Sequence, residues 1–228
     1  MNTNYIEELN ESQCAAVTYN DGPSLVIAGA GSGKTRVLTY KIAYLLENGY
    51  QPWNILALTF TNKAAREMKE RVGKLLSREE AKGLSVSTFH TFGLNLLRLE
   101  LKHLPLKNNF SILDADDCKR ILMDLMQRDN LSGAESKELI AKAMKKISDW
   151  KNDLIIPEQA HSVCETVEDV QLAHLYQLYE RNLRAYNAVD FDDLIVLPTR
   201  LLQENAEVRE KWQNRVRYLL VDEYQDTN

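Results

Sequence analysis

The chain has 228 residues, and its 28 basic and 33 acidic side chains give a net charge of −5. Hydrophobic residues make up 44% and charged residues 27% of the chain, which is typical of a globular protein large enough to bury a core. No run of about 18 apolar residues is present, which excludes a transmembrane helix and a membrane partner, and the polar N-terminal segment does not have the pattern of a signal peptide. The three cysteines lie far apart without CxxC spacing, which argues against a disulfide framework and predicts a cytoplasmic location. The mild acidity does not indicate nucleic acid, so such a function has to be argued from local motifs.

Short apolar runs predict parallel strands that are buried between helices. Three runs have this pattern, at residues 24–28, 54–60 and 217–221, and a fourth at 84–88 is weaker. Residues 62–76 instead repeat apolar side chains with the helical period. This alternation of strands and helices predicts an α/β domain with a parallel sheet and right-handed crossovers.

The segment AGAGSGKT directly follows the first predicted strand and begins a helix. Its small residues allow backbone N–H groups to close around phosphate oxygens at the N-terminus of that helix. We expect Lys34 to reach the β- and γ-phosphates and the Thr35 hydroxyl to bind Mg²⁺. A glycine-rich turn without a ligand is the alternative, and the strand before and the helix after the segment argue against it. The residues predicted to bind nucleotide here are Ala28, Gly29, Ala30, Gly31, Ser32, Gly33, Lys34 and Thr35.

The middle of the chain, residues 111–187, shows helical periodicity and no convincing strand. One predicted helix face carries Leu172, Leu175, Tyr176, Tyr179, Leu183 and Tyr186. We expect these tyrosines to pack in a core. The α/β character returns at residues 194–197 and in the last predicted strand. The sequence therefore predicts an all-helical domain, residues 111–187, inserted into an α/β domain made of residues 1–110 and 188–228.

The final segment, LLVDEYQDTN, places two carboxylates at the end of an apolar strand. We expect Asp222 to hold Mg²⁺ and Glu223 to orient and deprotonate an attacking water molecule. Adjacent carboxylates repel each other, and a divalent cation relieves that repulsion. A solvated acidic turn is the alternative. The helical insertion accounts for the long separation in sequence between Lys34 and Asp222.

Three further segments follow or lie near predicted strand ends: LTFTNKAAREM at residues 58–68, VSTFHTFG at 86–93 and DFDDL at 190–194. Ligands of parallel sheets bind at the carboxyl ends of the strands, so these segments are expected on the ligand-binding face. Taken one by one, Phe60, Phe89 and Phe191 are expected in the core. His90 is expected to be a structural histidine, and Asn62 is expected to be a helix N-cap. No His, Cys or Asp set has metal-ligand spacing, and no Ser–His–Asp arrangement is indicated.

Together, these motifs resemble those of superfamily-one DNA helicases of the UvrD, PcrA and Rep type. LNESQ, residues 9–13, is similar to the Q motif of that family, AGAGSGKT to motif I and LTFTNKAAREM to motif Ia. STFHTF is similar to motif Ib, DFDDL to motif Id and VDEYQDTN to motif II. The six motifs follow the order of the family and span essentially the whole chain. The resemblance implies a RecA-like P-loop NTPase domain with a parallel sheet, interrupted by an all-helical subdomain.

The resemblance also implies roles for individual residues. Gln13 would hydrogen-bond adenine, and Arg36 would contact the nucleotide or the motif II acids. Lys34, Asp222 and Glu223 would be catalytic, with Asp222 and Thr35 holding Mg²⁺. The residues implied to line the path of single-stranded DNA are Phe60, Thr61, Asn62, Thr88, His90 and Phe191. Aromatic faces stack on bases of any sequence, and hydroxyls and backbone amides hold phosphates, so a negative net charge does not contradict this role.

The activity implied by the resemblance is ATP- and Mg²⁺-dependent 3′–5′ translocation on single-stranded DNA, with unwinding at single-strand/duplex junctions during repair or replication. In that family, motif III, the second RecA-like domain and the arginines that stabilise γ-phosphate charge follow motif II. We therefore expect this chain to be an N-terminal fragment that hydrolyses ATP poorly without the rest of the helicase. Two alternatives remain open: the helicase portion of a RecB/AddA-type helicase–nuclease, and a catalytically silent nucleic-acid-binding module. A small-molecule kinase is disfavoured because it needs neither LTFTNKAA nor STFHTF.

Overall fold

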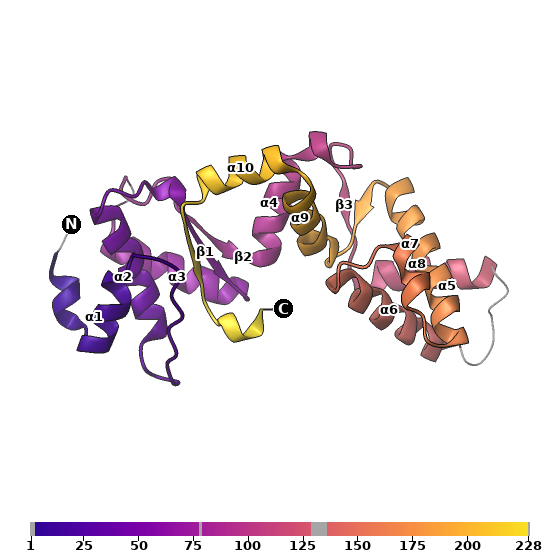
Figure 1. The fold of residues 1–228 in the computed structure, drawn as a ribbon, viewed down its shortest axis with the longest axis horizontal. Helices are drawn as coiled ribbons and strands as arrows, with labels where there is room; N and C mark the ends of the chain where they lie inside the picture. Colours follow the sequence, from indigo (N-terminus) through magenta and orange to yellow (C-terminus); the bar gives the residue numbers. More distant parts are fainter. Residues whose placement is uncertain (1–2, 78, 129–135, 228) are drawn as a thin grey trace. The chain divides into compact units, whose positions relative to one another are not determined.

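The structure, a computed structural model, describes residues 3–77, 79–128 and 136–227 (Figure 1). The chain forms two compact units, the first made of Met1–Phe92 with Glu210–Thr227 and the second of Gly93–Arg209. Within the described ranges, every helix is too short or too polar to cross a membrane.

The first unit is built on a parallel three-stranded sheet with the order β2–β1–β5. The central strand β1 (Ile55–Thr59) is fully buried, and β2 (Ser85–Thr88) and β5 (Tyr218–Val221) pair with it on either side. Leu56 lies opposite Ser85 in one ladder and opposite Leu219 in the other. These findings confirm the strands predicted at residues 54–60, 84–88 and 217–221, together with their parallel pairing.

Helices pack against this sheet around one apolar core. The helices that lie in the first unit, wholly or in part, are the 3-10 helix η1 (Thr3–Glu8), α1 (Glu11–Thr18), α2 (Lys34–Glu47), the 3-10 helix η2 (Pro52–Asn54), α3 (Asn62–Leu75), α4 (Phe89–Leu99), α10 (Ala206–Arg215) and the 3-10 helix η5 (Tyr224–Asp226). The core includes Val17 from α1, Ile42 and Leu45 from α2, Met68 from α3 and Leu220 from β5. Met68 lies on the face of α3 that the helical period of residues 62–76 predicted to be buried.

Residues 24–28 do not form the predicted strand. The side chains of Leu25, Val26 and Ile27 are 66%, 49% and 91% exposed, and no strand of the described residues pairs with them. An apolar run favours burial in a sheet, but a strand also needs a neighbour that completes its ladder of hydrogen bonds. That neighbour is absent beside these residues in the described sheet, so the prediction of a buried strand here is wrong.

The second unit is mainly helical (Figure 1). Its remaining elements are the 3-10 helix η3 (Leu101–His103), β3 (Ser111–Ile112), α5 (Ala115–Arg128), α6 (Ser136–Asn152), α7 (Pro157–Ala160), the 3-10 helix η4 (His161–Val163), α8 (Val167–Ala185), β4 (Ala188–Val189) and α9 (Asp193–Glu204). The helices α5, α6 and α8 pack around a core that includes Leu122, Ile147, Leu175 and Leu183. Helical periodicity therefore predicted this part of the fold well.

Two details differ from the sequence prediction. Tyr176 and Tyr179 are buried as predicted, but Tyr186 is 63% exposed because α8 ends at Ala185 and the helical period does not continue. Residues 194–197, which were expected to mark the return of α/β character, belong to α9. The short strands β3 and β4 pair in parallel on either side of the helical block. The predicted fold class, an α/β fold with a parallel sheet and a helical insertion, is confirmed.

Candidate nucleotide-binding site

The glycine-rich loop ends at Gly33, the N-cap of α2, and Lys34 is the first residue of that helix. Gly31 and Gly33 have φ angles of 77° and 85°, a left-handed conformation that side chains other than glycine rarely adopt. No side chain caps α2, so its first N–H groups point toward the loop without a side-chain acceptor. A helix N-terminus of this kind favours an anion such as a phosphate group.

Gln13 connects α1 to this loop. Its Nε2 donates to the backbone oxygen of Ser32 at 2.8 Å. Its Oε1 accepts from the backbone N–H of Asn10 at 3.1 Å, which completes a capping box at the start of α1. A Cβ added to Gly33 would lie 3.0 Å from Nε2, so the side chain packs closely on the loop. The family resemblance implied an adenine contact for Gln13, which stays a prediction, and the contact with Ser32 was not predicted.

The two carboxylates that follow β5 lie beside the loop lysine. Lys34 Nζ is 3.9 Å from Glu223 Oε1, and both side chains are partly exposed. The Asp222 N–H continues the sheet by donating to the oxygen of Leu58 at 3.0 Å, and Asp222 Oδ1 accepts from the Glu223 N–H at 3.1 Å. Burial and the neighbouring Glu223 raise the pKa of Asp222 above its ordinary value. A divalent cation at this position would relieve both effects.

The backbone of Glu223 is unusual for a residue with a side chain. Its φ of 52° lies in the left-handed region, which costs free energy and is concentrated at functional sites. Thr35 is half-buried in the first turn of α2, and Arg36 beside it is exposed. The Thr35 hydroxyl and the Asp222 carboxylate are hard oxygen ligands of the kind that suits Mg²⁺. The first unit therefore combines an uncapped helix N-terminus, a lysine and two adjacent carboxylates.

Three predicted DNA-contacting residues follow β1. Phe60 is 37% exposed, and its ring centroid is 5.1 Å from that of Phe89, with the planes tilted by 47°. Thr61 is the N-cap of α3, since its Oγ1 accepts from the Ala64 N–H at 3.1 Å. The prediction that Asn62 is the N-cap is wrong by one residue: Asn62 is exposed and begins the helix.

The segment after β2 is placed differently. Thr88 is buried, and its Oγ1 accepts from the Thr91 N–H at 3.1 Å and donates to Thr91 Oγ1 at 3.0 Å, so it holds the start of α4. His90 is exposed. In the second unit, Phe191 is 52% exposed in the turn before α9. The expectation that Phe60 and Phe191 lie in the core is wrong, because each follows a strand end in a turn that no neighbouring element covers fully.

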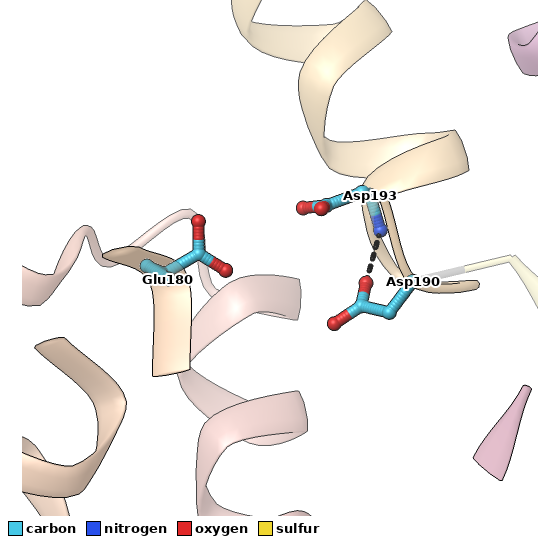
Figure 2. Close-up of side chains that lie close together, drawn as sticks. All are labelled: Glu180, Asp190 and Asp193. Atoms are coloured by element: carbon cyan, nitrogen blue, oxygen red, sulfur yellow. Dashed lines mark hydrogen bonds between the residues drawn. The ribbon is translucent and has the colours of Figure 1, made fainter. Parts of the chain in front are cut away.

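A buried ionic cluster surrounds the DFDDL segment. Carboxylate oxygens of Glu180, Asp190 and Asp193 lie within 4.8 Å of one another and point toward a common space (Figure 2). Lys151 Nζ lies 2.6 Å from Glu180 Oε1, 2.7 Å from Asp190 Oδ2 and 3.0 Å from Asp193 Oδ1. The ammonium group therefore takes the position that a metal ion would need, and the cluster is an ion-pair network.

Titration in this cluster follows from burial and charge. Burial raises the pKa of Asp193 to about 6, although Lys151 opposes that rise. Burial acts against the charged form of Lys151, but the three carboxylates outweigh it and raise its pKa. The sequence analysis missed this network. The available signal was a lysine four residues after the buried Ile147, on the apolar face of α6.

Comparison with known proteins gives a consistent result. Residues 9–228 match the family described as UvrD/REP helicase N-terminal domain. The chain is similar to the ATP-dependent DNA helicase Rep of Salmonella typhimurium and of Escherichia coli, with 54% identity over 221 residues that cover 96% of this chain and 32% of each relative. It is also similar to the ATP-dependent DNA helicase PcrA of Staphylococcus aureus, with 43% identity over 225 residues that cover 98% of this chain and 30% of the relative. The chain thus spans about a third of the length of these curated relatives.

Proposed function

The chain belongs to the UvrD/REP helicase N-terminal domain family, and from this premise we propose that it is the ATP-binding, N-terminal part of a 3′–5′ DNA helicase. The observation that carries the proposal is the approach of Lys34 to Glu223 beside the uncapped N-terminus of α2. The lysine and the helix N-terminus supply positive charge for the phosphates of a nucleoside triphosphate, and the carboxylate supplies negative charge near its Mg²⁺. In this proposal, residues 111–187 form a helical subdomain inserted into a RecA-like domain.

In this proposal, different residues of the chain contact the phosphates, the Mg²⁺ and the attacking water. The N–H groups at the start of α2 hold phosphate oxygens, and Lys34 neutralises the β- and γ-phosphates. The Thr35 hydroxyl and the Asp222 carboxylate would hold Mg²⁺, which would neutralise phosphate charge when bound. Glu223 orients the attacking water and accepts its proton. Lys34 and Glu223 are already near each other, so a γ-phosphate between them would replace an ion pair that is partly exposed to solvent.

Exposed side chains of both units are proposed to contact single-stranded DNA. The side chains of Phe60, His90 and Phe191 are exposed, and in this proposal bases stack on their rings, with about 1–3 kcal/mol for each stacked base. Thr61 and Asn62 lie at the N-terminus of α3, which favours a DNA phosphate. Thr88 is buried and caps α4, so its contribution to DNA binding is to position His90.

The proposal assigns unwinding to the longer helicase chain. Arginines that stabilise charge on the γ-phosphate contribute roughly 10³–10⁵ in rate in other NTPases. The described site contains Lys34 but no arginine within ion-pair distance of Asp222 or Glu223. We therefore expect slow hydrolysis by the 228 residues alone, with the rest of the helicase chain needed for DNA-stimulated turnover and for movement along single strands and at junctions.

ATP binding and turnover by the 228-residue chain test this proposal. The measurements are made with and without single-stranded DNA, on the wild type, on Lys34→Ala and on Lys74→Ala, in which an exposed lysine at the end of α3 is removed as a control. We expect the wild type and Lys74→Ala to bind ATP–Mg²⁺ and Lys34→Ala to lose most of that binding, with no DNA-stimulated turnover in any of the three. Equal nucleotide binding by the wild type and Lys34→Ala would refute the nucleotide site. Robust DNA-stimulated turnover that Lys34→Ala abolishes would refute the expected inactivity.

A further inference from the structure

We propose that Lys151 is a positioning residue for Phe191, and that it holds this exposed ring in the orientation needed to stack on a base of single-stranded DNA. The inference rests on the proposed function, because it concerns one of the proposed DNA-contacting side chains. Lys151 itself is buried, with 2% of its side chain exposed, and it does not contact DNA in this proposal. Its effect on DNA passes through the turn that carries Phe191.

The ammonium group of Lys151 holds this turn from both sides. It binds Asp190 Oδ2 at 2.7 Å, immediately before Phe191, and Asp193 Oδ1 at 3.0 Å, two residues after it. The other oxygen of Asp190 accepts from the Asp193 N–H at 2.9 Å and closes the turn. Tyr179 adds a third contact by donating its hydroxyl to Asp190 Oδ2 at 2.9 Å. One buried cation therefore links the residues on either side of Phe191, and the bonds from the Asp193 N–H and the Tyr179 hydroxyl support the same turn.

Glu180 and Arg184 of α8 hold the Lys151 ammonium group and the Phe191 turn in place. Glu180 Oε1 lies 2.6 Å from Lys151 Nζ, and Glu180 Oε2 lies 3.1 Å from Arg184 Nη2. The same Arg184 nitrogen lies 3.0 Å from Asp193 Oδ2, and its Nη1 donates to the Ala188 oxygen of β4 at 3.2 Å. The network therefore joins α6, α8, β4 and α9 around the turn.

Stability alone does not account for such a network. Burying charged groups costs free energy, and apolar residues of similar volume in their place are often as stable or more stable. What ion pairs and directed hydrogen bonds provide is one defined geometry. The ring of Phe191 is about half-exposed, so the backbone geometry of the turn contributes to the orientation of the ring. A ring that is already oriented binds a base without the entropic cost of ordering the turn.

A double-mutant cycle in single-stranded DNA binding tests the inference. Fluorescence anisotropy with a labelled oligothymidine measures the affinity of the wild-type chain, Phe191→Ala, Lys151→Met and the double variant. Lys145→Met is the matched control, because Lys145 is exposed on the same helix and the substitution removes the same charge. We expect Phe191→Ala to weaken binding by roughly 5- to 150-fold, the range for one stacked base. Lys151→Met should weaken DNA binding at least threefold in the wild-type background and should not weaken it further in the Phe191→Ala background. Lys145→Met should change the affinity for DNA less than twofold.

Hydrogen exchange separates the two possible failures. In Lys151→Met, the Asp193 amide should exchange at least tenfold faster, while the amide of Leu175 in the core of α8 keeps its rate. If Lys151→Met unfolds the chain, the charge-balanced variant Lys151→Met/Glu180→Gln replaces it in both measurements, with the same expected results.

The inference is overturned by an unchanged Asp193 exchange rate, by wild-type affinity in Lys151→Met, or by an equal loss of affinity with and without Phe191. An effect of Phe191→Ala within the error of the assay would instead refute the DNA contact assigned to Phe191 under the proposed function. In that case, faster Asp193 exchange in Lys151→Met would still show that the lysine orders the turn.

Discussion

At Gly93, α4 lies close to the backbone of α9. A Cβ at this position would lie 1.8 Å from the carbonyl oxygen of Leu194 and 3.4 Å from Cγ of Pro198. Pro198 lies inside α9 and has no N–H to donate to the carbonyl four residues earlier, which is that of Leu194. The space beside this carbonyl is occupied by Gly93, so we predict that Gly93→Ala destabilises the fold.

The magnitude follows from two opposing effects. Alanine favours a helix over glycine by about 1 kcal/mol, which would stabilise α4 if nothing lay beside it. To bring the contact with Leu194 from 1.8 Å to an acceptable 3.0 Å, the two backbones have to separate by about 1.2 Å. Overpacking of this kind typically costs about 1–3 kcal/mol or more, and the separation also weakens the packing of the buried Leu97 and Leu194. We expect a net loss of about 2 kcal/mol or more.

Urea unfolding followed by circular dichroism measures the effect on the free energy of unfolding. Gly73→Ala is the matched control, because Gly73 lies in α3 and a Cβ there has nothing within 4 Å. We expect that control to gain about 0.5–1 kcal/mol. If Gly93→Ala is as stable as the wild type, the close approach of α4 to α9 is not present and the reasoning fails.

Two further predictions concern pH. Burial lowers the pKa of Lys41 to about 8 in the folded chain, from 10.5 in the unfolded chain. Between these values the unfolded chain binds more protons, so the free energy of unfolding should rise as the pH increases from about 8 to about 10.5. Urea unfolding at several pH values should show that rise in the wild type and not in Lys41→Met; a parallel rise in both would contradict the assignment. At the N-terminus of α8, Lys146 and Thr166 lower the pKa of Asp169 to about 2, so this carboxylate stabilises the fold above pH 3.8 and the contribution is lost as the pH falls toward 2. Thr166→Ala should cost about 1 kcal/mol and raise the Asp169 pKa in an NMR titration, and an unchanged titration would show that the capping box does not form.

Local patterns in the sequence were sufficient for much of the fold. The apolar runs that became β1, β2 and β5 are buried or paired with each other, and the helical period correctly placed Leu175 and Tyr179 in the core of the second unit. The structure also places Lys34 Nζ 3.9 Å from Oε1 of Glu223, one of the two acids after β5, and the roles predicted for these residues stay predictions. These features depend on neighbours in sequence or on the general rule that parallel strands share a carboxyl edge.

Features set by distant partners could not be predicted in this way. Residues 24–28 have the composition of a strand, but pairing depends on a neighbour elsewhere in the chain. The surroundings of Lys151 come from α8, the turn after β4 and α9, and no local pattern indicates that three carboxylates converge on one lysine. The exposure of Phe60 and Phe191 is likewise decided by what covers a turn, which composition does not reveal.

The pairing of β1 with β5 has a consequence for the order of folding. Ile55 pairs with Tyr218, so the central sheet closes only when two distant parts of the chain meet. Closing a long loop costs entropy, and contacts between distant residues form slowly. In the sequence, residues 93–209 of the second unit separate these two strands and have their own core, so folding that unit first shortens the flexible chain that remains to be closed. Substitutions that weaken the helical core should therefore slow the assembly of the sheet that carries Asp222, even though they leave its residues unchanged.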